Sequence, residues 1–397
     1  MAKRLAIPSK EVKLSVVNRL GSVDLSRVQR LNVDANVSST DVDELGNNLH
    51  AGTVNDIPEI TVTFSGFDVG IRIFAALTGT DPDAYPGAGV DIANLGEIDA
   101  IFYIKSATAT DYVKSGHGKK LQIRDFTFNY SIDGESTEEY VAIGSQRRWF
   151  KNDIVVDTFE SGTTSFTLSE TPIQLKNGDY LLSVILDGDY LTEVSAGPST
   201  GEYSVSGTTL TTGDSRVSQA VAVYHANPAG DNWSYISDSV QAVAVRGQDV
   251  DILIGANDIL RVQSVSINGN LKPEAVKELG NRSIVGYQSQ VPTVEGQITV
   301  LDTDTELIEL LTTGSIDGGD TEFEIGKGCA ISGVSLEIKL IDPCDVEAPY
   351  TVLKTIYIPN ISVQGDSFVA NVNSNITQTF NYKSNDAQCI IYSGARA

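Results

Sequence analysis

Cysteine and histidine are scarce in this chain of 397 residues, which has three of each. The cysteines form no CxxC pair, and none of them lies near a histidine in the sequence. We therefore expect neither a disulfide framework nor a zinc site, and this usage is compatible with a reducing compartment. The residues concerned are Cys329, Cys344, Cys389, His50, His117 and His225.

Long apolar runs are absent from the sequence. No stretch approaches the roughly 18 consecutive apolar residues that a membrane-spanning helix needs. Residues 1–13 include basic residues but no apolar segment, so they lack the pattern of a secretory signal peptide. We expect a protein that is made in a cytoplasm and has no membrane partner.

Basic residues are outnumbered by acidic ones. Lys and Arg together number 28 and Asp and Glu 52, which gives a formal net charge of -24. A protein that binds duplex DNA needs an excess of basic over acidic residues, because phosphates bind Lys and Arg. The acidic excess has two interpretations, which are general solubility and a surface that stays close to nucleic acid without binding it.

The motifs of common active sites are missing. Gly326-Lys327-Gly328 lacks the rest of a P-loop, and the chain has neither a G-x-S-x-G elbow nor an H-E-x-x-H helix. Asp187 with Asp189, like Asp302 with Asp304, lacks the ligand spacing of an EF-hand loop. We predict no catalytic residue, no cofactor and no metal site, and therefore no enzyme.

The sequence does contain one stretch twice, at residues 27–58 and 261–292, with a constant offset of 234. Eleven of the 32 aligned positions are identical, whereas ordinary composition gives about two by chance. The chain therefore contains one supersecondary unit in two copies. The identities in the first copy are Arg27, Val28, Gln29, Asn36, Val42, Glu44, Leu45, Gly46, Asn47, Gly52 and Pro58.

Each copy begins with the same predicted elements. Apolar alternation predicts strands on both sides of Gly21, and Val28 joins the buried face of Leu31 and Val33 only if a bulge intervenes. A polar segment follows, at 38–56 in copy one and 272–290 in copy two. It is too long for a tight hairpin turn, which predicts a functional or mobile loop.

A strand after Pro58 or Pro292 and a short amphipathic helix come next in each copy. We expect Asp68 to cap the first helix and Gly79 to end it, with Asp302 or Asp304 and Gly314 in these roles in copy two. Later strands align at an offset of 235, which matches Phe126 with Ile361 and Phe128 with Val363. These strands are 101–105, 121–130, 334–341, 355–363 and 377–382.

Residues 151–235 have no counterpart in either copy. Short apolar strands separated by Gly, Asn and Asp predict a small all-β sandwich inserted at a loop. The aromatic residues at its borders, Trp149-Phe150 and Trp233-Ser234-Tyr235, are interpreted as anchors of a domain junction, with sugar binding as the alternative.

The duplicated unit resembles the tail tube proteins of long-tailed bacteriophages. The similarity lies in the order of strand, long polar loop with Glu-Leu-Gly-Asn (44–47 and 278–281), strand after proline, and helix. Residues 291–298 followed by 307–311 are the most similar part. The resemblance covers both copies and leaves out the insert.

The resemblance implies a mainly β fold. Two tandem β-sandwich or half-barrel domains, 1–150 and 236–397, each have one flanking helix, and the small sandwich at 151–235 lies between them. It also implies a structural subunit of the phage tail. Three chains then form a pseudo-sixfold ring whose sheets join into one barrel, and stacked rings form the conduit for genome ejection.

The partners and location follow from the same resemblance. The expected partners are further copies of the chain, other tail proteins such as the tape measure, terminator and distal tail proteins, and double-stranded DNA that passes through the lumen without specific binding. The expected location is the virion tail, assembled in the host cytoplasm. Asp and Glu are expected to line the bore and to repel DNA phosphates.

The polar segments are the expected contacts between neighbouring rings. Copy two has Lys277 where copy one has Asp43, and Arg282 where copy one has Asn48. Acidic residues of one segment are therefore expected to face basic residues of the other. The candidate residues are Asp41, Asp43, Glu44, Gly46, Lys272, Lys277, Glu278, Gly280 and Arg282.

Two alternatives remain open. One is a tail component with the same fold that does not polymerise, such as a distal ring or a baseplate hub. The other is a carbohydrate-binding or hydrolytic β protein in which the insert is the functional part. The insert itself is interpreted as an outer decoration that either stabilises neighbouring rings or adsorbs to cell surfaces.

Overall fold

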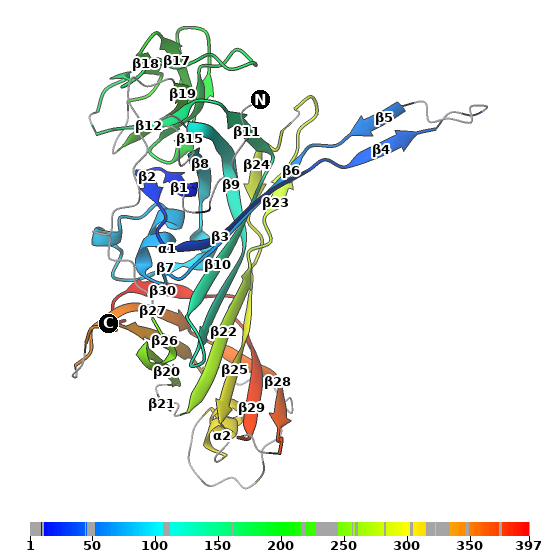
Figure 1. The fold of residues 1–397 in the computed structure, drawn as a ribbon, viewed down its shortest axis with the longest axis vertical. Coiled ribbons are helices and arrows are strands. Elements are labelled where there is room, and N and C mark those ends of the chain that lie inside the picture. The colour runs from blue at the N-terminus through cyan, green and yellow to red at the C-terminus, as the bar shows by residue number, and fades with distance from the viewer. Residues whose placement is uncertain are drawn as a thin grey trace, which may run out of the picture.

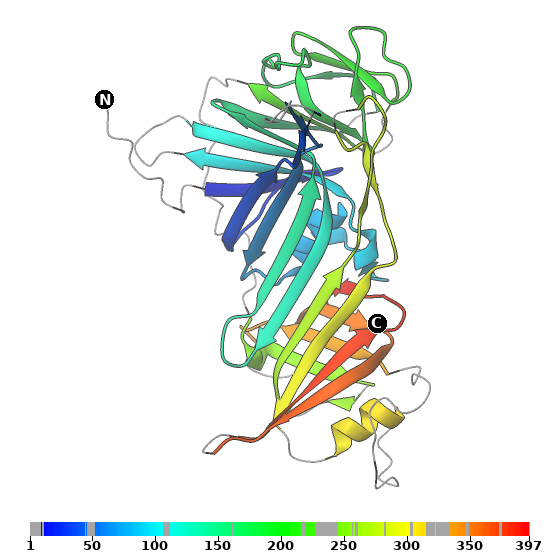
Figure 2. The ribbon, with the colours of Figure 1, turned by 90° about the vertical axis from the view of Figure 1, so that its right-hand side faces the viewer.

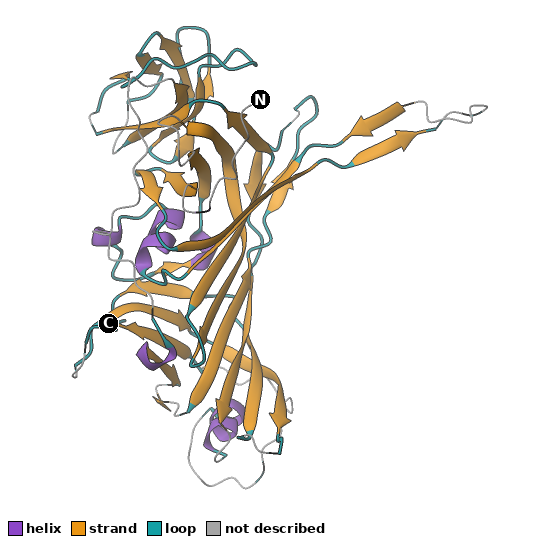
Figure 3. Cartoon of the chain, viewed as in Figure 1, coloured by secondary structure: helices purple, strands orange, loops and turns teal. Residues whose placement is uncertain are grey.

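The protein is mainly β in the computed structural model (Figure 3). Two α-helices and three short 3-10 helices accompany the strands among the residues that it describes. Within this part, no helix is both long and apolar enough to cross a membrane. The described residues are 9, 12–43, 45, 52–105, 112–160, 162–215, 219–226, 245–255, 257–258, 261–281, 283–301, 305–314, 322, 334–345, 349–372 and 375–396.

The first half of the chain folds into two sheets that share β9 (Tyr112–Ser131). The end of β9 closes a first sheet, in the order β3 (Val28–Asn36), β6 (Glu59–Gly66), β10 (Thr137–Gly144), β9. The start of β9 belongs to a second sheet, in the order β2 (Gly21–Asp24), β1 (Val12–Asn18), β8 (Glu97–Lys105), β9, β11 (Gln146–Phe150).

The second half repeats both sheets. Its first sheet has the order β22 (Val262–Asn270), β25 (Thr293–Leu301), β29 (Thr377–Ser384), β28 (Ile361–Val369). Its second sheet has the order β21 (Asn257–Asp258), β20 (Val250–Ile254), β26 (Leu336–Ile341), β27 (Val352–Ile358), β30 (Ile390–Ser393), followed by β7 (Val90–Asp91) from the first half. β9 pairs with β22, so the two first sheets form one continuous row of strands (Figure 2).

The register of the strands gives the true correspondence between β9 and β28. Phe126 lies opposite Tyr140 and Asp366 lies opposite Phe380, and these neighbours occupy equivalent places in the two sheets. Phe126 therefore corresponds to Asp366, an offset of 240, and the alignment at 235 is wrong here. The offsets 235 and 240 differ by five residues, an odd number that should exchange the two faces of a strand. Bulges at Arg124 and Gln364 also reverse the side-chain alternation, so the offset of 235 still matched apolar with apolar residues.

β9 and its counterpart differ in continuity. β9 bends at Lys120, whose φ is 51°, and remains one strand. At the corresponding place the second half has Pro359-Asn360, which separates β27 from β28. Proline has no N–H to donate to the ladder, so the second half has two strands where the first half has one.

The repeated Arg-Val-Gln at the start of β3 and β22 has a local cause. Arg27 and Arg261 adopt left-handed backbone, with φ of 50° and 64°, and a bulge follows each of them. The side-chain amide of Gln29 donates to the main-chain carbonyl of Arg27 at 3.2 Å. The side-chain amide of Gln263 donates to the carbonyl of Arg261 at 3.1 Å. The bulge predicted before Leu31 is thus confirmed, and it occurs in both copies.

The helices end as predicted but begin differently. α1 (Ile71–Thr78) ends at Gly79 with φ 62°, and α2 (Glu306–Thr313) ends at Gly314 with φ 85°. Asp68 is not the N-cap, because Gly70 holds that position and Asp68 accepts a bond from its N–H at 3.1 Å. Thr305 is the N-cap of α2 and makes no side-chain cap bond, while Asp302 and Asp304 lie outside the described residues. The 3-10 helices are η2 (Pro82–Ala84), η3 (Ile92–Asn94) and η4 (Gly247–Asp249).

The insert contains two four-stranded sheets. One has the order β12 (Asp153–Phe159), β19 (Ala220–Ala226), β14 (Leu181–Leu186), β15 (Asp189–Tyr190). The other has the order β13 (Ser165–Thr167), β18 (Thr209–Thr212), β17 (Glu202–Ser206), β16 (Thr192–Glu193). The first of them packs on the second sheet of the first half through an apolar cluster that includes Val17, Ile101, Ile185 and Val223.

The polar segments expected as loops are two-stranded arms. In the first arm β4 (Ser39–Val42) pairs with β5 (Gly52–Asn55), and in the second arm β23 (Glu274–Val276) pairs with β24 (Gly286–Gln288). Every residue of β4 and β5 is exposed, and the first arm projects from the body (Figure 1). With solvent on both faces, an arm has no apolar alternation by which a sequence reveals a strand.

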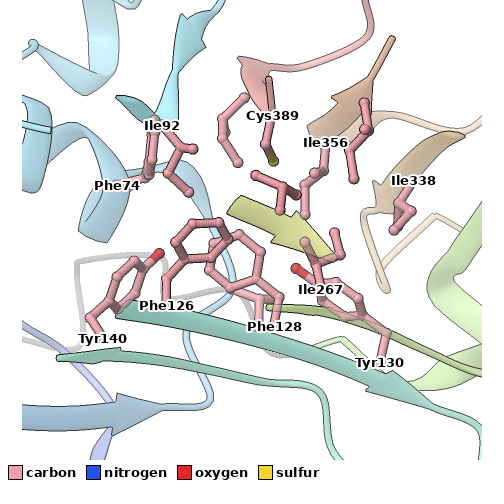
Figure 4. Packing of buried hydrophobic residues seen from close by; sticks show 14 of the residues in the cluster. Phe74, Ile92, Phe126, Phe128, Tyr130, Tyr140, Ile267, Ile338, Ile356 and Cys389 are labelled. Atoms are coloured by element: carbon pink, nitrogen blue, oxygen red, sulfur yellow. The ribbon is translucent and has the colours of Figure 1, made fainter. Parts of the chain in front are cut away.

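One hydrophobic core runs through both halves. Figure 4 shows Phe126, Phe128 and Tyr130 of β9 packed with Ile267 of β22, and Cys389 of the second half close to Ile92 of the first. Burial raises the pKa of the Cys389 thiol. The two halves are therefore packed as one body, and one face of the seam between them lies in the core.

Candidate assembly interface

The seam between the halves is an antiparallel pairing of β9 with β22. Seven residues of each strand take part, from Ser131 opposite Ser264 to Asp125 opposite Asn270. On the core side Tyr130 faces Val265 and Phe128 faces Ile267, and none of these four side chains is more than 2% exposed. Main-chain hydrogen bonds and buried cross-strand pairs together stabilise this seam.

Two strand edges remain at the ends of the continuous row. In the described part of the chain, β3 pairs only with β6 and β28 pairs only with β29. β3 is the counterpart of β22, and β28 is the counterpart of β9. The two outer edges are therefore the same pair of edges that meet at the internal seam.

Burial differs between the seam and the outer edges. Leu31 and Val33 of β3 are half-buried, whereas their counterparts Val265 and Ile267 are 1% and 0% exposed. Phe368 of β28 is 56% exposed, whereas its counterpart Phe128 is 0% exposed. An edge without a partner strand and with exposed apolar side chains can recruit another strand. At the edge of β3 the carbonyl of Val33 accepts a hydrogen bond from Nη1 of Arg147 at 3.0 Å.

An ion pair lies behind the seam and joins the halves. Lys354 Nζ of β27 is 2.5 Å from Glu138 Oε1 of β10, and both side chains are 0% exposed. The hydroxyls of Tyr130 and Tyr140 donate to the two oxygens of Glu138 at 2.9 Å each. Burial raises the pKa of Glu138 above its ordinary value, although Lys354 and the two tyrosines act to lower it. The pair holds the second sheet of one half against the first sheet of the other.

A second buried carboxylate anchors the insert. Asp99 of β8 is 0% exposed, and its Oδ2 lies 2.8 Å from Nε2 of His117. Its Oδ1 accepts from the hydroxyl of Tyr190 in the insert at 2.8 Å and from the N–H of Lys120 at 2.9 Å. Burial acts to raise the pKa of Asp99, but His117, Ser183 and the N–H of Lys120 outweigh it and lower the pKa. A hydrogen-bonded His–Asp pair recurs in active sites, yet here both side chains are closed off from solvent.

The face of the row that points away from the core is polar and weakly charged. Thr, Ser, Asn and Gln alternate there with the buried residues, as in Thr61 and Thr63 of β6 or Gln297 and Thr299 of β25. Its eight charged residues include ion pairs of Arg124 with Asp125 at 2.7 Å and of Arg30 with Glu139 at 3.8 Å. The acidic residues are Asp34, Glu59, Asp125, Glu139 and Glu295, and the basic ones are Arg30, Arg124 and Lys383.

The structure places the predicted ring contacts on the two arms. Asp41 and Asp43 are exposed on the first arm, and Glu278 and Gly280 are exposed on the second. Lys272 precedes β23 with φ 46°. Lys277 lies 3.6 Å from Asp56 of the same chain, so one basic residue of the second arm already meets the base of the first. Glu44, Gly46 and Arg282 lie outside the described residues.

Comparison with known proteins gives a distant structural similarity. No family model and no curated protein matches the chain. Among solved structures it is similar to a chain of the extended sheath-tube complex of an extracellular contractile injection system, PVC, with 20% sequence identity. The alignment covers 40% of this chain and 99% of that chain, with a TM-score of 0.25.

Proposed function

We propose that this chain is the structural subunit of a phage-tail-like tube, in which chains join edge to edge into a ring. The observation that carries the proposal is the internal seam. The outer edges β28 and β3 are second versions of β9 and β22, which already pair within one chain. Pairing β28 of one chain with β3 of the next repeats this contact and leaves no edge open once the ring closes.

The internal seam also supplies a register for the contact between chains. With the offsets of 240 for β28 and 234 for β3, Phe368 lies opposite Val33 of the next chain, where Phe128 lies opposite Ile267 in the seam. Ala370 then lies opposite Leu31, and Ser367 opposite Asp34. The half-buried apolar residues of β3 and the exposed Phe368 thereby become core residues. This stabilises the contact by roughly 25 cal/mol for each Å² of apolar surface buried.

Ring size and stacking follow from the resemblance to tail tube proteins. Six equivalent sheets per ring correspond to three chains with two copies each. Both arms extend from the connection between the first two strands of a first sheet, β3 to β6 and β22 to β25. They are the parts of the chain best placed to contact a stacked ring, and the tape measure, terminator and distal tail proteins are the further partners of such a tube.

In this assembly the polar face of the row lines the bore. Its charged residues carry a net -2 of the -24 of the whole chain. Three such chains make a weakly acidic lining rich in hydroxyl and amide groups, with less charge than the composition alone implied. Such a surface has no basic cluster to hold DNA phosphates, which fits passage of DNA without specific binding.

Electron microscopy of the purified chain tests the proposal. The expected result is rings that contain three chains by mass measurement, together with tubes that lengthen with protein concentration. Rings that never elongate would favour a distal ring or baseplate hub. Monomers at every concentration would overturn the proposal, and glycan binding or hydrolysis by such monomers would favour the carbohydrate alternative.

Disulfide cross-linking tests the register. The double variant Val33→Cys with Phe368→Cys, with Cys329 and Cys344 replaced by Ser, should form covalent trimers under oxidation. The matched control pairs Val33→Cys with Val363→Cys, since Val363 occupies the facing position only under the offset of 235. Cross-linking of the control in place of the first variant would reject the proposed register.

A further inference from the structure

A cleft of about 580 Å³ opens where β11 meets the insert. Arg148 and Lys151 line it from the chain around β11, and Lys176 lines it from the insert. The rings of Phe150 and His225 form part of its wall, with centroids 4.6 Å apart. A volume of this size is typical of sites for small molecules.

The charge of the cleft is opposite to that of the protein. Three of its lining residues are basic and none is acidic, in a chain with 28 basic and 52 acidic residues. Within the described part of the chain, Arg148, Lys151 and Lys176 have no ion pair or side-chain hydrogen bond. Burial lowers the pKa of His225, so this ring stays neutral and the positive charge comes from Arg and Lys.

The fold itself does not require these cations. Arg148 pairs with His117 of β9, and the equivalent residue of the second half, Ile390, pairs with Tyr357 of β27. By the same register Trp149 corresponds to Ile391. The second half builds the same strand mainly from apolar residues. Arg147 of β11 donates to the carbonyl of Val33 at 3.0 Å, whereas Arg148 is available to a ligand.

The lining groups define the chemistry of that ligand. A guanidinium group binds a carboxylate or phosphate through two parallel hydrogen bonds, and lysines add charge without that geometry. The amides of Gln174 and Asn177 line the same cleft and can bond hydroxyl groups. Aromatic walls pack against the apolar faces of a sugar ring.

We propose that this cleft binds an anionic saccharide, with its acidic group at Arg148 and the neighbouring lysines and its ring against the aromatic wall. The insert then brings a binding function to the outside of the molecule. This site is complete within one chain and does not depend on ring formation.

Calorimetric titration of the full chain with galacturonic acid, galactose and galactose 6-phosphate tests the proposal. Galacturonic acid should bind at least about tenfold more tightly than galactose, because the charge-assisted bonds are lost with the neutral sugar. A tighter galactose 6-phosphate complex would identify the acidic group as phosphate and would still support an anionic site. Equal binding of galactose and galacturonic acid, or no binding of either acidic sugar, would overturn the proposal.

Variants locate the binding within the cleft. Arg148→Gln and Lys176→Gln should each weaken the binding of galacturonic acid. For Arg148→Gln the dissociation constant should rise by about tenfold. Lys176 is exposed, so its replacement tests the site without disturbing the fold. Lys383→Gln, an exposed lysine of β29, is the matched control and should bind as the unmodified chain does. Binding that is unaffected by both cleft variants would place the ligand elsewhere and reject the site.

Discussion

Phe126 of the first half lies across Gly269 of the second half. A Cβ atom at Gly269 would come within 1.8 Å of Cε1 and 2.0 Å of Cζ of this ring. Phe126 is 1% exposed and packs against Phe128, with ring centroids 5.1 Å apart. The seam therefore requires glycine at this position, because no side chain fits beneath the ring.

Gly269→Ala should destabilise the seam. The ring of Phe126 must move within a packed core, which costs about 1–3 kcal/mol. Urea unfolding should show the loss as a lower midpoint. Gly52→Ala is the control, since a Cβ there meets nothing within 4 Å. Equal stability of the two variants would contradict this account of the seam.

Lys354→Met should be more damaging than removal of the whole ion pair. The single variant leaves Glu138 buried beside two tyrosines without its cation. This should lower the free energy of unfolding by about 3–5 kcal/mol. The double variant Glu138→Gln with Lys354→Met leaves no buried charge and should lose less in urea unfolding. A double variant that is no more stable than the single one would show that the pair acts through packing and not through charge.

The cost of Lys354→Met should depend on pH. Burial raises the pKa of Glu138 in the folded protein, and removal of the cation raises it further. A raised folded pKa gives a contribution to stability that is fully present below the unfolded pKa of about 4.3 and is lost as pH rises through the folded pKa. The variant should therefore approach the unmodified protein in stability towards about pH 4 and fall behind it at neutral pH.

Acid should loosen the insert through Asp99. The pKa of Asp99 is lowered in the folded protein. Its contribution to stability is therefore present above the pKa of about 3.9 in the unfolded chain, and it is lost as pH falls through the pKa in the folded protein. Hydrogen exchange at β15 and at the start of β9 should increase in that window. Asp99→Asn should produce the same increase at neutral pH, whereas Asp189→Asn, an exposed neighbour of Tyr190, should not. Unchanged exchange in Asp99→Asn would remove Asp99 from this role.

Charge reversal on the second arm should stop tube growth at low salt. Lys277→Glu with Arg282→Glu places like charges where the acidic first arm of a stacked ring is expected. Lys277 and Asp56 are 51% and 60% exposed, and loss of such a surface pair costs about 1 kcal/mol at most, so folding should persist. Higher salt should restore growth by screening. Lys176→Glu on the insert is the control, and polymerisation of the double variant at low salt would reject this contact.

Local patterns predicted the elements whose cause is local. The glycines that end α1 and α2 adopt the expected left-handed backbone, because helix termination depends on the residue that follows the last turn. Alternation predicted β6 and β25, each of which buries one face. The bulge before Leu31 was also predictable, since Val28 otherwise falls on the wrong face of the sheet.

The failures have a common origin in tertiary context. Arms with solvent on both faces leave no periodic signal, and Asp68 bonds to Ser26 across the fold instead of capping a helix. The offset of 235 failed because bulges at Arg124 and Gln364 restore apolar matches after a slip. The resemblance implied that sheets join at their edges but did not identify the strands, and the exposed Phe368 becomes a meaningful signal only once its counterpart Phe128 is known.

The sequence by itself determined that this protein is mainly β and holds one unit twice, because duplication and side-chain alternation are properties of the chain alone. It also determined the acidic balance, with 52 acidic and 28 basic residues. Only the tertiary structure decided which strands meet. Pairing partners are chosen by main-chain hydrogen bonds and by buried contacts between residues far apart in the chain, such as Phe126 with Gly269 and Glu138 with Lys354. The tertiary structure also decided that the two outer edges repeat the two edges of the seam.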